Sequence, residues 1–281
     1  MKTLKTLFRQ DKEAFAVPKG VQDVIPVIRI WQDGIFQVGK NKYSKCYRFT
    51  DINYAVASRN DKEGMFLEYS ELLNSFDTGA TTKITILNRR LNKVDFEKNI
   101  LLPLVEDELD EYRKEYNKML LDKSTGSNGI TQEKFLTISI NKRSIEEARN
   151  YFTRISADLI NHFSQLGSKC IELEAQDRLR LCHDFYRQGE ENAFSFDIVQ
   201  SMKKGHSFKD FICPDSFNFE KDYFKMGNKY GRVIFLKEYA SYIKDNMIAE
   251  LTDLNRNMMI SIDVIPIPMD EAVREVENRR L

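Results

Sequence analysis

The sequence predicts an α+β protein with mixed or antiparallel sheets, helices packed on one face of them, and duplicated strand–helix units. Short β-branched runs bounded by turn residues recur along the chain, which is the pattern of strands. Between these runs, apolar residues recur at the spacing of helices that cover a core. Because both kinds of element have an apolar face to bury, layers of sheet covered by helices are expected.

The composition is that of a folded globular protein with no net charge. The chain has 281 residues, with 43 Lys plus Arg against 43 Asp plus Glu, and its 42% of apolar residues exclude a disordered tail. The balanced charge argues against a protein that coats DNA through a basic surface. No apolar run approaches the roughly 18 residues of a membrane span, and no signal peptide is visible. Four cysteines lie at irregular spacings, as in reduced cytosolic proteins: Cys46, Cys170, Cys182 and Cys213.

The first 23 residues read as a basic arm, and residues 24–121 as a first α+β lobe. Apolar residues of the arm share a helical spacing, so a surface-lying helix and a loosely held terminus both account for it. The lobe begins with β-branched strands joined by the turn residues Asp33 and Gly34, and a meander is the simplest arrangement. The expected elements are strands at 24–30, 35–38 and 43–49, a helix at 63–76, a strand at 83–87 and a long charged helix at 96–121.

A linker is predicted at residues 122–131, which contain two glycines and small polar residues, and a second lobe at 132–281. The second lobe opens with a strand at 135–140 and a helix that begins at a capping box formed by Ser144 and Glu147. One stripe of this helix is apolar, and Gly167 ends it. The further elements are strands at 170–173, 232–236 and 258–265, helices at 177–186 and 247–254, and a final helix opened by Pro268.

Two strand–helix units resemble each other in sequence. Residues 137–148 and 259–272 share a strand face, a short loop and an acidic helix start. A degenerate duplication explains the likeness, and so does independent use of the same strand-to-helix pattern.

Residues 34–41 have the G-x-x-x-x-G-K spacing of a phosphate-binding P-loop. Asn41 stands where that loop needs a Ser or Thr for Mg²⁺, and the residues between the glycines are bulky strand formers. The segment also continues as a strand, whereas a P-loop leads into a helix. A β-hairpin explains all of these features, and no nucleotide site is predicted.

No metal or catalytic constellation is predicted either. His183 follows Cys182 on a helix, where adjacent side chains point about 100° apart and cannot readily share a zinc ion. His162 is isolated, and His206 and Cys213 have no second pair of ligands. The acidic residues at 106–111 are mixed with basic ones and indicate a solvated helix face.

Aromatic residues and lysines raise a nucleic-acid alternative. Lys203, Lys204 and the aromatic stretch at 217–230 suggest a platform on which single-stranded bases could stack. The balanced charge and the regular strand–helix pattern favour ordinary core aromatics instead.

Ordered motifs over residues 17–281 resemble the N-terminal region of conjugative-transfer ATPases of Gram-positive type IV secretion systems, in the CagE/TrbE/VirB component family. The order of the motifs carries this resemblance. The motifs are Val17-Pro18-Lys19, residues 21–26, Asp33-Gly34-Ile35-Phe36, Tyr43-Ser44-Lys45, residues 49–54, residues 86–90, residues 174–187 with Arg178-Leu179, residues 259–262, and Ala272-Val273.

The resemblance implies that this chain is the part before the motor, so that Leu281 is not the natural end of such a protein. The Walker motifs, the arginine finger, ATP and Mg²⁺ would belong to a C-terminal RecA-like domain absent from the chain. No catalytic, cofactor-binding or metal residue is assigned to the chain itself, which is expected not to be an enzyme.

The function expected from the resemblance is non-catalytic docking and assembly in horizontal gene transfer by conjugation. The implied partners are inner-membrane channel proteins and neighbouring subunits, and the implied location is the cytoplasmic face of the membrane. Residues 1–20 are available for peripheral membrane contact. The alternative is a nucleic-acid-binding module that contacts the transferred single strand.

Overall fold

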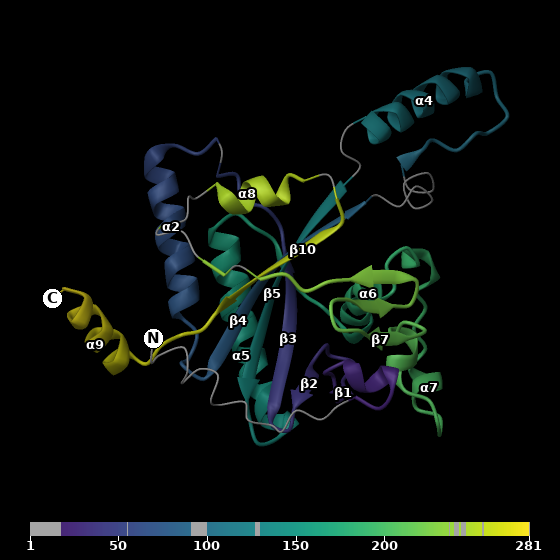
Figure 1. The fold of residues 1–281 in the computed structure, drawn as a ribbon. Coiled ribbons are helices and arrows are strands. Elements are labelled where there is room, and N and C mark those ends of the chain that lie inside the picture. Colours follow the sequence, from purple (N-terminus) through teal and green to yellow (C-terminus); the bar gives the residue numbers. More distant parts are fainter. Residues whose placement is uncertain are drawn as a thin grey trace. The chain divides into compact units, whose positions relative to one another are not determined.

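The computed structural model in Figure 1 has α+β architecture, as the sequence predicts. It describes residues 18–54, 56–90, 100–126, 130–235, 237–238, 242, 246–254 and 256–280. Within these ranges there are seven α-helices, a mainly antiparallel sheet of seven strands and a small sheet of three strands. The first 17 residues of the predicted basic arm lie outside the described residues.

The chain divides into two compact units. The larger unit consists of Val27–Arg178 and the described residues after 235, and the smaller unit consists of the described residues up to Pro26 and Leu179–Phe235. The seven-stranded sheet belongs to the larger unit, and the three-stranded sheet belongs to the smaller one.

The large sheet has the strand order β1-β2-β3-β5-β4-β10, and β6 pairs with the C-terminal part of β3. All of its pairings are antiparallel. The strands are β1 (Arg29–Ile30), β2 (Phe36–Gly39), β3 (Lys42–Phe49), β4 (Ala80–Arg90), β5 (Ile130–Asn141), β6 (Cys170–Glu172) and β10 (Met258–Val264). Strands from both sides of the predicted linker therefore share one sheet.

The meander predicted for the first strands is confirmed, because β1, β2 and β3 are successive neighbours. Residues 34–41, with the P-loop-like spacing, form β2 and the turn of the β2–β3 hairpin, as the sequence indicates. The first strand is shorter than expected: Val21–Val24 form the 3-10 helix η1, and only Arg29 and Ile30 pair. Pro26, which has no backbone N–H to donate, lies between the two.

The core lies between β5 and the helix α5 (Ile145–Gln165). Leu136, Ile138 and Ile140 share one face of β5, as predicted, and all three are buried. The predicted apolar stripe of α5 is also confirmed, since its members from Ala148 onward are buried. In this layer the hydroxyl of Tyr47, from β3, and Ser156 Oγ, from α5, lie 2.9 Å apart and share a hydrogen bond. Burial raises the pKa of the Tyr47 phenol, so it stays protonated.

The ends of α5 follow the signals in the sequence. Ser144 Oγ accepts a hydrogen bond from the Glu147 backbone N–H at 3.3 Å, as expected for an N-cap. The Glu147 carboxylate accepts from the N–H of Arg143 and not from that of Ser144, so only half of the predicted capping box has the usual partners. Gly167 follows the last turn with φ +74°, the left-handed conformation that favours glycine there.

Helix α2 (Arg59–Asn74) lies beside α5 (Figure 1) and confirms the helix predicted at 63–76. Its C-terminal part buries Leu72, and Phe76 follows the helix into the same core. Phe66, in the predicted apolar stripe, is exposed. The stripe thus supports packing only over the last turns of the helix.

Strand β10 and the helix α9 (Met269–Arg280) confirm the last predicted strand and helix. Strands β5 and β10 flank β4 on opposite sides. Their following helices differ, because α5 buries seven residues whereas the described side chains of α9 include none that is buried. The structure does not show the proposed duplication.

Two predicted elements are corrected. The long helix expected at 96–121 is interrupted, because residues 101–109 form a loop in which Glu106 has φ +60°, and α4 begins after that loop at Asp110. Residues 96–99 lie outside the described residues. That helix, α4 (Asp110–Gly126), runs into the predicted linker, and β5 starts at Ile130.

The second correction concerns the strand expected at 232–236. Residues 232–235 pair with no described strand and are exposed, and Leu236 lies outside the described residues. A β-branched sequence alone does not make a strand where no neighbouring strand is available to pair.

The remaining elements are short. Helix α8 (Met247–Thr252) belongs to the larger unit and confirms the helix predicted near 247–254. Helix α6 (Ala175–Tyr186) begins in the larger unit and ends in the smaller one. The other elements of the smaller unit are η2 (Glu191–Ala193), α7 (Ile198–Ser201), η3 (Phe208–Phe211), β7 (Phe217–Phe219), β8 (Phe224–Met226) and β9 (Lys229–Gly231).

Candidate functional site

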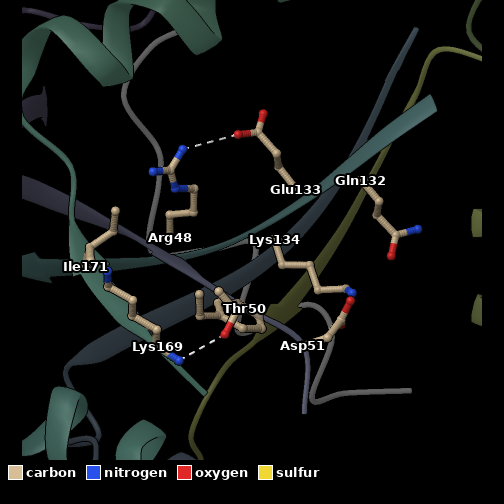
Figure 2. Close-up of a pocket in the computed structure, with 9 residues that line it drawn as sticks. Arg48, Thr50, Asp51, Gln132, Glu133, Lys134, Lys169 and Ile171 are labelled. Carbon is tan, nitrogen blue, oxygen red and sulfur yellow. Dashed lines mark hydrogen bonds and ion pairs between the residues drawn. The ribbon is translucent and has the colours of Figure 1, made fainter. Parts of the chain in front are cut away.

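A polar cleft opens in the larger unit at the point where β3 ends (Figure 2). Its volume is about 470 Å³, within the range of ordinary ligand sites. Side chains from the end of β3, from the first residues of β5 and from the β6 region surround it. The lining residues are Arg48, Phe49, Thr50, Asp51, Gln132, Glu133, Lys134, Lys169 and Ile171.

The cleft exists because β3 is shorter than its neighbour β5. Pairing between the two strands stops at Phe49 opposite Lys134, whereas β5 and β4 stay paired back to Ile130 opposite Arg90. Residues 130–133 therefore have a strand on only one side among the described residues. This short free edge of β5 forms one wall of the cleft.

Beyond Phe49 the chain bends away from β5 and towards the segment before β6. The Thr50 N–H donates to the carbonyl of Lys169 at 3.0 Å, and the Lys169 N–H donates to Thr50 Oγ1 at 2.9 Å. These two hydrogen bonds hold the far wall in place and leave the edge of β5 uncovered on this side.

At the cleft, three cationic side chains pair with two carboxylates, and a fourth cation, Lys169, also lines the cleft. Glu133 is bracketed by Arg48, at 3.4 Å, and by Arg89. The Lys134 ammonium points toward Asp51 and pairs with it (Figure 2). Lys169 has no acidic partner in the part of the chain that the structure describes, and it is exposed. The local balance is therefore positive.

The lining of the cleft offers groups that can bind a polar ligand. Among the described residues of the cleft there is no Cys, His or Ser that could serve as a nucleophile or as a base near neutral pH. Arginine and lysine donors, the Thr50 hydroxyl and the Gln132 amide offer hydrogen bonds, and Phe49 and Ile171 add apolar surface. Such a set can bind an anionic or extended polar group.

Helix α4 presents a second candidate surface. Four exposed apolar residues follow one another at spacings of three, four and three residues: Leu109, which directly precedes α4, and Tyr112, Tyr116 and Met119 within it, all 43–68% exposed. That spacing places them on one side of the helix. We call these four residues the α4 stripe.

A neighbouring side of α4 faces the loop that precedes it. Asn117 exchanges hydrogen bonds with the backbone of Leu102, donating from Nδ2 at 2.8 Å and accepting at Oδ1 at 2.9 Å. Arg113 binds both Asp107 and Asp110. The acidic run predicted to be a solvated face is thus partly used in ion pairs that hold loop and helix together.

The three-stranded sheet of the smaller unit carries aromatic side chains. The rings of Phe217 and Phe219 are stacked with centroids 5.9 Å apart, and those of Tyr223 and Tyr230 are 5.8 Å apart. The Lys225 ammonium lies over the Tyr230 ring at 4.8 Å. Phe219, Tyr223 and Tyr230 are exposed, so the aromatic stretch at 217–230 is not simply core.

Each of the three histidines lies near a different acidic residue. His162 lies 3.9 Å from Glu68, His183 lies 3.5 Å from Asp184, and His206 lies 3.7 Å from Asp210. No group of three or more potential metal ligands occurs among the described residues. All four cysteines are free, and burial raises the pKa of the Cys170 thiol to about 12, which makes it unreactive.

Sequence reasoning missed the residues of the cleft. Arg48 lies near the end of the strand predicted at 43–49, and Lys134 lies just before the strand predicted at 135–140; charged residues are ordinary at both places. Residues 132–134 are polar and lie outside the strand predicted at 135–140, so no pattern in the sequence indicates that β5 extends past β3. Lys169, 35 residues later, joins the site only through the pairing of β6 with β3.

None of the helices described is both long and apolar enough to cross a bilayer. Comparison with protein-family models and with curated proteins found no match to this chain.

Proposed function

We propose that this chain is the non-catalytic docking and assembly domain of a conjugative-transfer ATPase of the type IV secretion kind. In this role it binds channel proteins of the inner membrane and neighbouring subunits at the cytoplasmic face. ATP and Mg²⁺ act in a motor domain outside this chain. The motif order along residues 17–281 suggests the family, and the exposed surfaces support a role in recognition.

The observation that carries this proposal is the α4 stripe. Exposed apolar side chains that line up along a helix are a common way for one protein to bind a helix of another. Tyrosine is also among the residues enriched at the centres of interfaces. The stripe joins two tyrosines to Leu109 and Met119 on one side of α4, and all four are open to solvent.

The proposal is tested by self-association of the chain. Sedimentation velocity at rising concentration is expected to show larger species for the wild type and fewer for the double variant Tyr112→Ser/Tyr116→Ser. Lys114→Ser/Lys118→Ser, which changes exposed residues of the same helix outside the stripe, is the matched control and should behave as wild type. Identical profiles for the wild type and the stripe variant would remove the support for assembly through α4.

The proposal that the chain is non-catalytic has its own test. The purified chain is expected to hydrolyse ATP no faster than a blank preparation. Turnover well above the blank would show that the chain is itself an enzyme and would overturn this part of the proposal.

A second function, binding of single-stranded nucleic acid, is favoured by the exposed aromatics of β7–β9. Bases stack on exposed rings, and nearby lysines contact phosphates. Fluorescence anisotropy with labelled oligothymidylate would show binding that falls steeply with salt, because phosphate contacts release counterions. The variant Tyr230→Ala would weaken it. Absence of binding at low salt would eliminate this alternative.

A further inference from the structure

We propose that the cleft at the end of β3 binds an extended acidic segment of a partner protein, which adds as a short strand beside the free edge of β5. The inference rests on the proposed docking function and names the chemistry of one partner. Two independent features of the cleft support it, one from the backbone and one from the charges.

The backbone feature is the unpaired edge of β5. Residues 130–133 are in strand conformation and pair with β4, so their remaining hydrogen-bonding groups on the other side face the space that β3 leaves. In a strand, successive residues direct these groups to alternate sides, so about half of the four face the cleft. A peptide of about four residues, roughly 13 Å long, would continue the line of β3. Strand addition at a free edge is an established way to bind extended peptides.

The charge feature is the set of cations at both faces of this edge. Arg48 is opposite Phe135 in the register, and Lys134 is opposite Phe49, one residue away. Since adjacent residues of a strand point to opposite faces, Arg48 and Lys134 lie on opposite faces of the sheet. Lys169 lines the same cleft without an acidic partner among the described residues.

A strand added beside β5 also presents its side chains to both faces of the sheet. Its alternate side chains project to the Arg48 face and to the Lys134 face, so acidic residues at successive positions find a cation on each side. The carboxylates of Glu133 and Asp51 are already paired with Arg89, Arg48 and Lys134. Lys169 therefore supplies the positive charge that is not yet paired.

The space also fits an extended segment better than a lone anion. A volume of about 470 Å³ is large for one phosphate group, and apolar atoms of Phe49 and Ile171 lie in the lining. A peptide strand uses the polar edge, the cations and this apolar surface together. Free phosphate and anionic lipid are outcomes that the experiment separates.

The test uses the full chain and a fluorescein-labelled, capped peptide of threonines with a central run of four glutamates, so that acidic side chains project to both faces of an added strand. Fluorescence anisotropy is expected to show saturable binding that weakens with salt. An analogue N-methylated at alternate backbone positions should bind much more weakly, because it keeps the charges and cannot pair as a strand. A lysine–threonine peptide should not bind.

The variant Lys169→Glu should weaken binding by about tenfold, because the cleft loses its unpaired cation and gains an acid. Lys169 is exposed, so the fold is expected to survive, which thermal unfolding checks. Lys40→Glu is the matched control, since Lys40 is an exposed lysine in the turn at the other end of β3. It should bind the peptide as the wild type does.

Several results would overturn the inference. Equal affinity for the N-methylated peptide would mean that charge alone acts, and displacement of the peptide by millimolar inorganic phosphate, or binding to anionic vesicles only, would assign the cleft to phosphate groups. Equal effects of Lys169→Glu and Lys40→Glu would place binding elsewhere. If the peptide fails to bind while the α4 stripe variants still alter self-association, this inference falls and the proposed docking function stands.

Discussion

Arg178 shows how one buried cation can organise strands that are distant in sequence. Its Nη1 donates to the carbonyls of Gly34 and Ser44, both at 2.7 Å, and its Nη2 donates to Ser44 Oγ at 3.0 Å. The guanidinium also lies over the ring of Phe36, 3.9 Å from its centroid. The planar fork of arginine allows these contacts at once, which a lysine ammonium cannot reproduce.

We therefore expect Arg178→Lys to lower the free energy of unfolding by about 2–4 kcal/mol, because it leaves buried carbonyls without donors. Urea denaturation measures the change. Arg180→Lys, at an exposed position of the same helix, should change stability by less than about 0.5 kcal/mol. Equal small effects at the two positions would show that the Arg178 contacts are dispensable.

Gly34, whose carbonyl binds Arg178, is a position where only glycine fits. Its φ is +78°, and a Cβ added there would lie 1.9 Å from the carbonyl oxygen of Leu173. We expect Gly34→Ala to destabilise the protein by about 3 kcal/mol or more, since strain and a backbone clash add. Gly64, inside α2 with open space around it, is the control. Gly64→Ala should raise stability by up to about 1 kcal/mol in the same denaturation experiment.

At the scale of elements, the start of α4 depends on ion pairs. Hydrogen bonds from Arg113 hold the pKa values of Asp107 and Asp110 below their ordinary value of 3.8, and Asp110 also accepts from the N–H groups of Val105 and Glu106. Because the folded pKa values are lowered, these carboxylates stabilise the loop–helix junction above pH 3.8, and the contribution is lost as the pH falls through the lowered values.

We expect carboxyl-carbon NMR titration to place both aspartates below pH 3.8, and Arg113→Gln to return them towards that value. Lys114→Gln, at the next residue, should leave both titrations unchanged. If both midpoints stay low in Arg113→Gln, the arginine is not the cause.

The elements that sequence could predict are those whose pattern and packing agree. Helix α5 and strand β5 have apolar stripes of the right period, and both bury them against each other. Residues 101–109 and 232–235 have plausible patterns, but local preference cannot decide where no tertiary packing partner is found among the described residues. The cleft was beyond sequence reasoning for a related reason: it depends on the register between β3 and β5, and register is set by long-range pairing.

At the scale of the whole molecule, stability is expected to vary strongly along the chain. Residues 135–140 of β5 are buried or half-buried and paired on both sides, whereas Val233, Ile234 and Phe235 are 81–85% exposed without a described strand partner. Hydrogen exchange follows local opening, so segments with few buried contacts exchange early.

We expect amide hydrogen exchange, followed by mass spectrometry, to be slowest at residues 135–140 and much faster at residues 232–235 and in α4. The comparison is made at low and high protein concentration, because an apolar extended segment is a template for pairing between chains. Concentration-independent fast exchange at 232–235 confirms that this segment is unpaired in the single chain. Protection that grows with concentration shows that it pairs between copies, and slow exchange at every concentration would contradict the exposed conformation of this segment.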